Sequence, residues 1–262
     1  MEGSQRSSST LKAEAPAFTP SWINIGNDAQ NAEAMPGHGE TLAPDVACDA
    51  NMKPWLCSID VECIATGRTS ADRAVARVAL VDGDENVLMD ALVRPKEKIV
   101  SYLTPLTGLE PGSLDDAPSL EEVRAELIKL LPKNAVIVGQ AIQHDLDWLR
   151  LEEGTHFASS FDIGQLFRME RGPGRFRYFS LRHEVLHLEG FKGAGVDMQA
   201  GAHDPTLDAI YSVRIYQRFA DAPEEDLLRA RAKLSRVPAT HPIWRKTPMI
   251  DNVQVGPPWI YK

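Results

Sequence analysis

Two acidic side chains stand two residues apart inside an apolar run, LCSIDVEC, which holds Asp60 and Glu62. The run has the composition of a buried strand, and on a strand these two side chains share one face while Ile59 and Val61 fill the other. Burying two like charges is costly unless a cation lies between them. The pair therefore indicates a metal site, unless the strand runs out into solvent, where neighbouring acids are harmless.

Other candidate side chains stand at the starts of two predicted helices. Asp145, in GQAIQHDLDWL, follows a predicted strand, and α/β folds place their sites at that end of a strand. Asp147 competes with it, but on a helix Asp145 shares a face with Leu149 whereas Asp147 points elsewhere. His203 and Asp208, in HDPTLD, can both reach toward a site near the start of their helix. The alternative for this last segment is a capping loop with a surface histidine.

The stretch HEVLH, from His183 to His187, matches the helical pattern that binds zinc in metalloproteases. In the longer form of that pattern the third ligand position falls on Gly193, and the next glutamate after Glu189 is Glu224. Only two ligands are present where a catalytic zinc needs three, so the sequence argues against a zinc hydrolase.

A sheet with helices around it must position these residues. Strands are predicted at 56–63, 74–82, 86–95 and 134–140, a strand turning into a helix at 159–167, and helices at 119–131, 144–152, 180–190 and 203–219. The DGDEN turn indicates an antiparallel hairpin between the second and third strands. Ser119 and Glu122 have capping-box spacing, and Asp204 and Pro205 suit a helix start. The order predicts a mixed α/β sheet with helices on its faces.

Composition indicates one globular domain with tails. The chain has 262 residues, of which 43% are apolar and 25% charged, and its three cysteines form no C-x-x-C pair, so neither a disulfide framework nor a zinc ribbon is expected. We expect a flexible tail over 1–52, one domain over 53–220 and an irregular extension over 221–262.

Charge and hydropathy limit the partners and the location. The net charge of −9 argues against a protein that coats nucleic acid nonspecifically, but it permits an enzyme that binds a few nucleotides through metal ions. No apolar run approaches the roughly 20 residues that cross a bilayer, and the first residues resemble neither a secretory nor a mitochondrial leader. We therefore expect no membrane partner and an intracellular protein of the nucleus or cytoplasm.

The segments SIDVE, GQAIQHDLDWL and HDPTLDA resemble, in order, the three motifs of the DEDDh or DnaQ-like 3′-to-5′ exonucleases. Stretches between them are similar to Rex-type RNA exonucleases and to the nuclease domain of the Pan2 deadenylase, over about 56–219. The resemblance implies a ribonuclease H-like α/β fold. One departure is Gln140, where Rex-type enzymes usually have a histidine, and we expect it to affect substrate contacts more than chemistry.

The resemblance also implies roles for five side chains. Asp60, Glu62, Asp145 and Asp208 would hold two divalent cations, Mg²⁺ or Mn²⁺, which prefer carboxylate ligands. His203 would be the general base that takes a proton from the attacking water, a role that suits an imidazole. The substrate would be the 3′ end of a nucleic acid, most simply single-stranded RNA.

Substrate contacts are expected at two places. In the family the loop after the first motif meets the terminal nucleotide, which implicates Ile64, Ala65 and Thr66. The segment RMERGPGRFRYFSLR interleaves arginines with aromatic residues and can pair with phosphates and stack on bases. Its arginines include Arg175, Arg177 and Arg182. The alternative is an exposed basic loop whose aromatic side chains pack back on the core.

Two alternatives to an RNA exonuclease remain at this point. The first is a DNA exonuclease, because both polymers suit the same metal ions. The second is a nucleic-acid-binding or scaffolding module that uses the same fold without efficient cleavage, with the tails as possible binding sites for protein partners.

Overall fold

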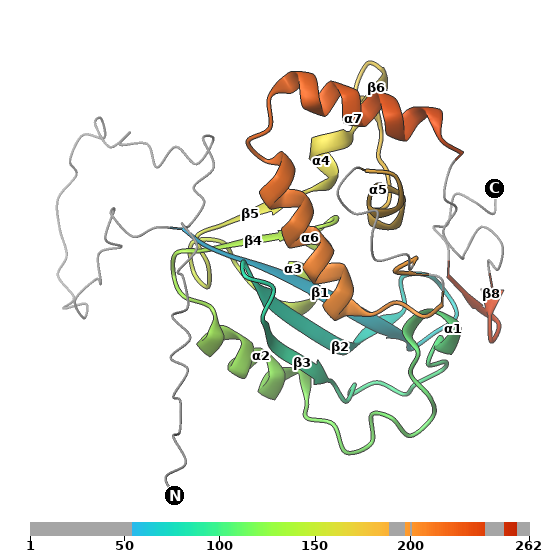
Figure 1. Cartoon of the computed structure of the whole chain (residues 1–262). Helices are drawn as coiled ribbons and strands as arrows, with labels where there is room; N and C mark the ends of the chain where they lie inside the picture. The colour runs from blue at the N-terminus through green and yellow to red at the C-terminus, as the bar shows by residue number, and fades with distance from the viewer. Residues whose placement is uncertain (1–53, 189–196, 200, 239–248, 256–262) are drawn as a thin grey trace, which may run out of the picture.

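The computed structural model describes residues 54–188, 197–199, 201–238 and 249–255 (Figure 1). Its strands are β1 (Trp55–Ala65), β2 (Arg73–Asp82), β3 (Val87–Leu92), β4 (Ala135–Gly139), β5 (Ser159–Asp162), β6 (Met169–Gly172), β7 (Arg175–Arg177), β8 (Met249–Ile250) and β9 (Val253–Gln254). Its helices are α1 (Thr104–Thr107), α2 (Leu120–Leu130), α3 (Gln143–Leu149), α4 (Gly164–Phe167), α5 (Leu181–His187), α6 (Pro205–Phe219) and α7 (Glu224–Arg236). The predicted flexible tail over 1–52 lies outside the described residues.

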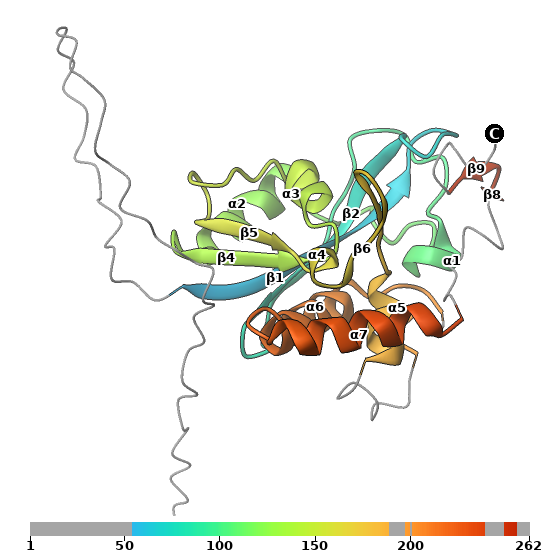
Figure 2. The same ribbon diagram turned by 90° about the horizontal axis from the view of Figure 1, so that it is seen from above.

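A five-stranded mixed sheet forms the centre, in the order β3-β2-β1-β4-β5. The pairs β1–β2 and β2–β3 are antiparallel, whereas β1–β4 and β4–β5 are parallel. Helices α2 and α3 lie on one side of the sheet, and α5, α6 and α7 lie on the other (Figure 2). The predicted mixed sheet flanked by helices is confirmed. Among the described helices, none is long and apolar enough to cross a membrane.

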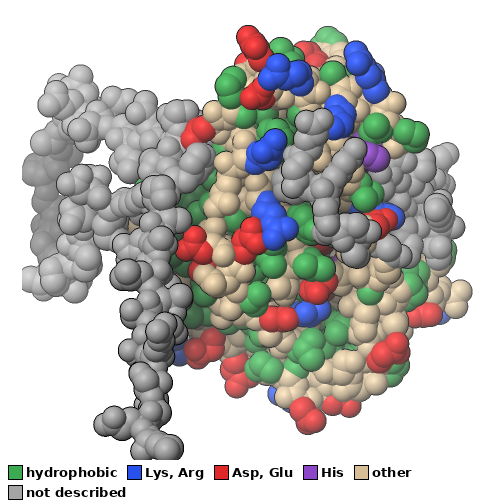
Figure 3. All heavy atoms as spheres, in the orientation of Figure 1, with side chains coloured by type: hydrophobic (Ala, Val, Ile, Leu, Met, Phe, Trp, Pro, Cys, Tyr) green, Lys and Arg blue, Asp and Glu red, His purple; other side chains and the backbone are tan. Residues whose placement is uncertain are grey.

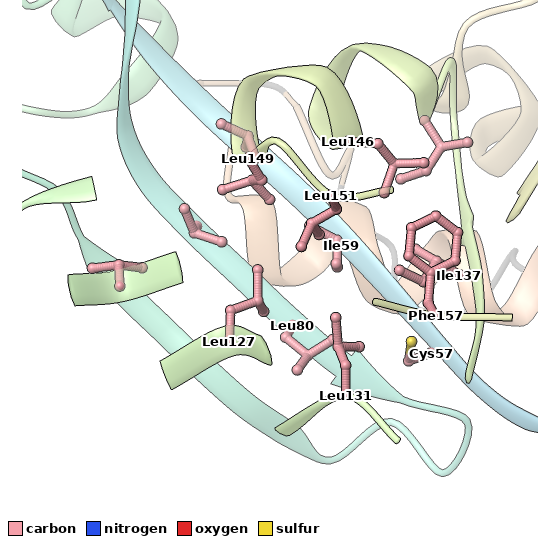
Figure 4. Packing of buried hydrophobic residues seen from close by; sticks show 14 of the residues in the cluster. Cys57, Ile59, Leu80, Leu127, Leu131, Ile137, Leu146, Leu149, Leu151 and Phe157 are labelled. Carbon is pink, nitrogen blue, oxygen red and sulfur yellow. The ribbon is translucent and has the colours of Figure 1, made fainter. Parts of the chain in front are cut away.

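The two faces of β1 serve different purposes. Cys57, Ile59 and Val61 belong to the apolar cluster under α2 and α3. In Figure 4 leucines of these two helices surround Ile59 and Leu80. Leu56 instead packs in the cluster that includes α6. Because side chains alternate along a strand, Asp60 and Glu62 point to the α6 side.

Helix starts follow the predicted capping residues. The Ser119 side chain accepts a hydrogen bond from the Glu122 backbone N–H, and the Glu122 carboxylate accepts one from the Ser119 N–H, so α2 has a complete capping box. Asp204 caps α6 by accepting from the Thr206 N–H at 3.1 Å, with Pro205 at the first helical position. The Asp204 cap and Pro205 fix where α6 begins, and α6 carries a candidate site residue in its first turn.

The prediction of an irregular segment over 221–262 is wrong for its described parts. Helix α7 follows Pro223, with Glu224, Glu225 and Asp226 in its first turn and basic residues in its last, which is a favourable charge order for a helix. Its Ala230 and Leu234 are buried against the α6 side of the sheet. The hairpin of β8 and β9 also lies in this segment.

Charge is unevenly distributed on the molecule. On the face seen in Figure 3, Lys and Arg side chains gather in the upper half, which α6 and α7 occupy in Figure 1, while Asp and Glu dominate the lower half. The acidic balance of the whole chain therefore does not extend evenly over its surface.

Candidate functional site

Three elements bring the candidate acids together around the end of β1. Asp60 and Glu62 lie on β1, Asp145 in the first turn of α3, and Asp208 in the first turn of α6. Asp145 Oδ1 accepts a hydrogen bond from the Val61 backbone N–H at 3.0 Å. Because Val61 separates Asp60 from Glu62, this bond holds the start of α3 beside both carboxylates.

His203 completes the group from the loop before α6. Its Nδ1 lies 3.8 Å from Glu62 Oε1 and 4.0 Å from Asp208 Oδ2. Within the part of the chain that the structure describes, these three residues form the one group of His, Cys, Asp or Glu side chains close enough to hold an ion together. The His203 backbone N–H donates to the Leu106 carbonyl at 2.6 Å, which fastens this loop to α1.

The carboxylates of the site have strongly raised pKa values. Burial, followed by the nearby Asp145, Asp208 and Glu62, raises the pKa of Asp60 well above its ordinary value. Burial, followed by Asp208 and Asp145, raises the pKa of Glu62 to about 8. Burial is also the largest cause for Asp145 and Asp208, whose pKa values are both raised to about 7. Four acids that disfavour their own charged forms are a favourable environment for cations.

The same residues fit divalent cations by their chemistry. Carboxylate oxygens are the ligands that Mg²⁺ and Mn²⁺ prefer. Asp208 Oδ1 is buried and accepts no hydrogen bond from any described residue, an arrangement that is costly unless a further partner binds there. The donor set and this free oxygen are both consistent with a metal site.

His203 is suited to accept a proton. Burial, and then the charge of Arg182, lowers the pKa of His203 below its usual value of 6.5. The imidazole is therefore neutral at physiological pH. Its side chain is still 34% exposed, so a water molecule can reach it.

Arg77 is a basic side chain at the site that the sequence did not single out. It pairs with Glu62 in the register of β1 and β2, and its guanidinium binds both oxygens of Asp90 at 2.7 Å. Its Nη2 also lies 3.4 Å from Asp204 Oδ1 at the α6 cap. Arg77 thus links β3 to the start of α6, and no sequence motif marked it.

The predicted contacts of the loop after the first motif need correction. Ile64 and Ala65 are fully buried, Ile64 against Leu109 and Leu114. Both residues still belong to β1, whose end bonds to Ser101, so their side chains cannot meet a nucleotide as predicted. Thr66 is partly exposed and stays a candidate.

The basic segment after α4 folds into the hairpin of β6 and β7. Arg175 is exposed, and Arg177 lies over the Phe179 ring at 4.8 Å. Phe176 and Tyr178 are 40% and 49% exposed, so aromatic surface is available beside these cations. Arg182, by contrast, binds Asp197 through two nitrogens. Arg175 and Arg177 remain available for phosphates, whereas Arg182 already has an anionic partner.

Gln140 has a structural contact. Its Nε2 donates to the Phe179 carbonyl at 2.9 Å, one residue before the Ser180 cap of α5. This amide therefore supports the approach to α5, and the expectation that the departure from the Rex-type pattern concerns substrate contacts stays a prediction.

The HEVLH stretch forms α5 and lies in the core. His183 is 2% exposed, stacks on Phe179 and has Nε2 3.0 Å from the Leu234 carbonyl. His187 packs edge-on against His183. Described residues offer no third ligand near these imidazoles. The histidines of this stretch pack α5 against α7.

Glu184, in the same helix, leads to a prediction about stability. It is fully buried, neither carboxylate oxygen has a hydrogen-bond partner among the described residues, and burial raises its pKa well above the ordinary value. Glu184→Gln should therefore raise the free energy of unfolding at pH 7.5 by roughly 1–3 kcal/mol, because glutamine fills the same space and needs no proton at that pH, and each unit of pKa difference corresponds to about 1.4 kcal/mol. Chemical denaturation of both proteins measures this difference.

The difference in stability between wild type and Glu184→Gln should also depend on pH. An unfolded glutamate ionises with a pKa of about 4.3, whereas folded Glu184 keeps its proton to a higher pH. The wild type thus loses stability as pH rises from the unfolded toward the folded pKa, and the glutamine variant lacks this loss. The gap between them should widen with pH. Glu110→Gln, at an exposed position, is the control, and equal stability of wild type and Glu184→Gln across the range contradicts the prediction.

Comparisons with known proteins agree with this arrangement. Residues 57–166 match the family model RNase_T, described as exonuclease. The chain is 29% identical over 170 residues to RNA exonuclease 4 of Candida glabrata, covering 64% of this chain and 61% of that one. It is 30% identical over 173 residues to RNA exonuclease 4 of Aspergillus fumigatus, covering 66% and 53%. The chain thus spans little more than half the length of these relatives.

Solved structures share the fold. The Saccharomyces cerevisiae Pan2 module in complex with A7 RNA superposes with a TM-score of 0.54 at 23% identity, over 72% of this chain and 34% of that one. The Neurospora crassa Pan2 catalytic unit gives 0.53 at 22%, over 74% and 31%. The resemblance to exonucleases inferred from the sequence motifs is confirmed.

Proposed function

We propose that the chain is a divalent-metal-dependent 3′-to-5′ exonuclease acting on single-stranded RNA, since its residues 57–166 match the exonuclease family model. The observation that carries the proposal is the convergence of four carboxylates with raised pKa values, from β1, α3 and α6, beside one neutral histidine. Structural acids are seldom gathered in this way without cations, because burying like charges is costly.

Asp60, Glu62, Asp145 and Asp208 would hold two cations, Mg²⁺ or Mn²⁺. When bound, such ions supply an activated water and stabilise the oxygen that leaves the phosphate. The protein contributes fixed positions for these ligands. The Val61 N–H orients Asp145. The Asp204 cap and Pro205 fix where α6 begins, and so fix the position of Asp208 in its first turn.

His203 would act as the general base. Its Nδ1 lies near Glu62 and Asp208, and its lowered pKa keeps the ring in the proton-accepting form. A water bound between these groups can therefore give its proton to His203 as it attacks the phosphodiester. Partial exposure of the ring lets that proton pass to solvent after each cycle.

The choice of RNA rests on the names of the curated relatives, which are RNA exonucleases. Thr66 would lie near the terminal nucleotide, and Arg175 and Arg177 would contact phosphates further from the 3′ end, with Phe176 and Tyr178 available for stacking on bases. An RNA substrate would be met in the nucleus or the cytoplasm.

Degradation of a 5′-labelled single-stranded RNA tests the proposal. With Mg²⁺ or Mn²⁺ we expect a ladder of products shortened from the 3′ end, and a chelator should abolish it because the carboxylates alone cannot activate water. A circular RNA of the same sequence is the matched control and should resist. A DNA of the same sequence should be degraded more slowly.

Each other outcome has a defined meaning. Faster degradation of DNA would assign the site to a DNA exonuclease. Cleavage of the circle would indicate an endonuclease. Binding of the linear RNA without shortening, with either metal, would identify a nucleic-acid-binding module and overturn the proposal.

A further inference from the structure

A continuous series of polar contacts runs from α5 to a carboxylate of the site. Arg182 donates from Nε to Asp197 Oδ1 at 2.8 Å and from Nη2 to Asp197 Oδ2. Asp197 Oδ1 also accepts from the Gln199 backbone N–H at 3.3 Å. The Gln199 side chain then donates from Nε2 to Asp208 Oδ2 at 2.8 Å. We call these residues, Arg182, Asp197, Gln199 and Asp208, the relay.

The last contact of the relay restricts the Asp208 carboxylate. The terminal torsion of an aspartate is broad, so the α6 backbone alone does not fix the plane of this carboxylate. An amide donor on Oδ2 fixes the plane and leaves Oδ1, which is buried and has no partner among the described residues. Groups that hold a metal ligand in place in this way commonly change metal affinity when they are removed.

The other contacts of the relay hold Gln199 itself. The described residues around it, 197–199, form neither helix nor strand, so the regular backbone does not position the amide. A two-bond arginine–carboxylate pair has a fixed geometry and supplies that anchor. Both side chains are only about a quarter exposed, 26% for Arg182 and 27% for Asp197, so the pair is partly shielded from solvent.

We propose that Gln199 is a positioning residue for Asp208, and that the Arg182–Asp197 pair acts on the site by holding Gln199. The inference rests on the proposed metal-dependent function. It also reassigns Arg182, which the sequence analysis placed among the substrate contacts. Within the relay, Arg182 acts on Asp208 through Asp197 and Gln199 and not through a phosphate.

Metal binding without RNA gives the direct test. Calorimetric titration of Mn²⁺ into the whole protein should show Mn²⁺ affinity reduced by about tenfold in Gln199→Leu and in Gln199→Ala. Leucine keeps the volume of the glutamine side chain but lacks the amide donor. The metal concentration for half-maximal cleavage should rise by the same factor. KM for RNA at saturating metal should stay unchanged, which a general loss of structure would not produce.

Variants of the pair test the second step. Arg182→Ala and Asp197→Ala should each lower Mn²⁺ affinity, and the double variant should be no weaker than either single one, because both remove the same anchor. The Mn²⁺ affinity of Arg182→Lys should lie between those of the wild type and Arg182→Ala. Arg214→Ala is the matched control. Arg214 lies further along α6, outside the relay, and makes an equivalent two-bond pair with Glu85, at 2.7 and 2.6 Å. This variant should leave Mn²⁺ affinity unchanged.

Each result decides a separate point. Wild-type Mn²⁺ affinity in both Gln199 variants would overturn the proposal. A higher KM for RNA with unchanged Mn²⁺ affinity in Arg182→Ala would overturn the second step and restore Arg182 as a substrate contact. A wild type that binds Mn²⁺ but leaves RNA intact would overturn the proposed function while the Gln199 measurement still decides the relay. A wild type that binds no Mn²⁺ would overturn both.

Discussion

Asp60→Asn should lower the rate of RNA cleavage by at least about a thousandfold, equivalent to about 4 kcal/mol of transition-state stabilisation. Asp60 lies near the other three acids, since Asp145, Asp208 and Glu62 all raise its pKa. Asparagine keeps the shape of the side chain but loses the anionic ligand that this position offers to cations. Single-turnover cleavage of 5′-labelled RNA, at several metal concentrations, measures the loss.

The same substitution should stabilise the protein when no metal is present. Burial and like charges raise the folded pKa of Asp60, so in the wild type its stability contribution is lost as pH rises toward that pKa. At pH 7.5 in chelator, Asp60→Asn should therefore have a higher Tm than the wild type. Added Mn²⁺ should raise the Tm of the wild type strongly and that of the variant little, because ligands stabilise the form that binds them.

Asp147→Asn provides the matched control, since Asp147 lies on α3 two residues after Asp145 but is exposed, with Oδ1 bound by the Gln143 amide. It should cleave RNA at the wild-type rate and show the wild-type response of Tm to Mn²⁺. If Asp60→Asn, purified free of contaminating nuclease, keeps more than about a tenth of the wild-type rate, Asp60 holds no essential cation.

Local periodicity was enough to predict most of the scaffold. The two-residue period of β1 placed Asp60 and Glu62 on one face, and the α6 side is the face they occupy. The 3.6-residue period of α3 separated Asp145, which is buried, from Asp147, which is exposed. Spacing alone, however, could not bring Asp145 and Asp208 to the same place, because they are distant in sequence. The family resemblance supplied that expectation.

Contacts between residues distant in sequence were not predicted. Ile64 was taken for a loop residue because the apolar run ends at Cys63, but pairing with β2 and contacts with Ser101 extend β1 to Ala65. Arg182 was assigned to the substrate because nothing in its neighbourhood predicts Asp197, fifteen positions later, as its partner. Side-chain pairs closed across loops have no period in the sequence, and only the fold shows them.

His203→Ala should lower kcat by about a hundredfold to ten-thousandfold, the usual contribution of a general base, with little change in KM. The ring has its Nδ1 near Glu62 and Asp208 and no described contact with the basic hairpin of β6 and β7, so its loss should spare RNA binding. Its side chain is 34% exposed, and the alanine variant leaves a space that solvent can reach. Added imidazole should therefore restore part of the rate.

The pH profile separates a base from a residue that only supports the fold. Burial lowers the pKa of His203, so the fall of wild-type kcat at acid pH, at saturating Mn²⁺, should have its midpoint below the usual imidazole value of 6.5. In His203→Ala this limb should disappear, and the residual rate should rise with hydroxide concentration. A variant that keeps the wild-type acid limb, and gains nothing from imidazole, would show that another group takes the proton from water.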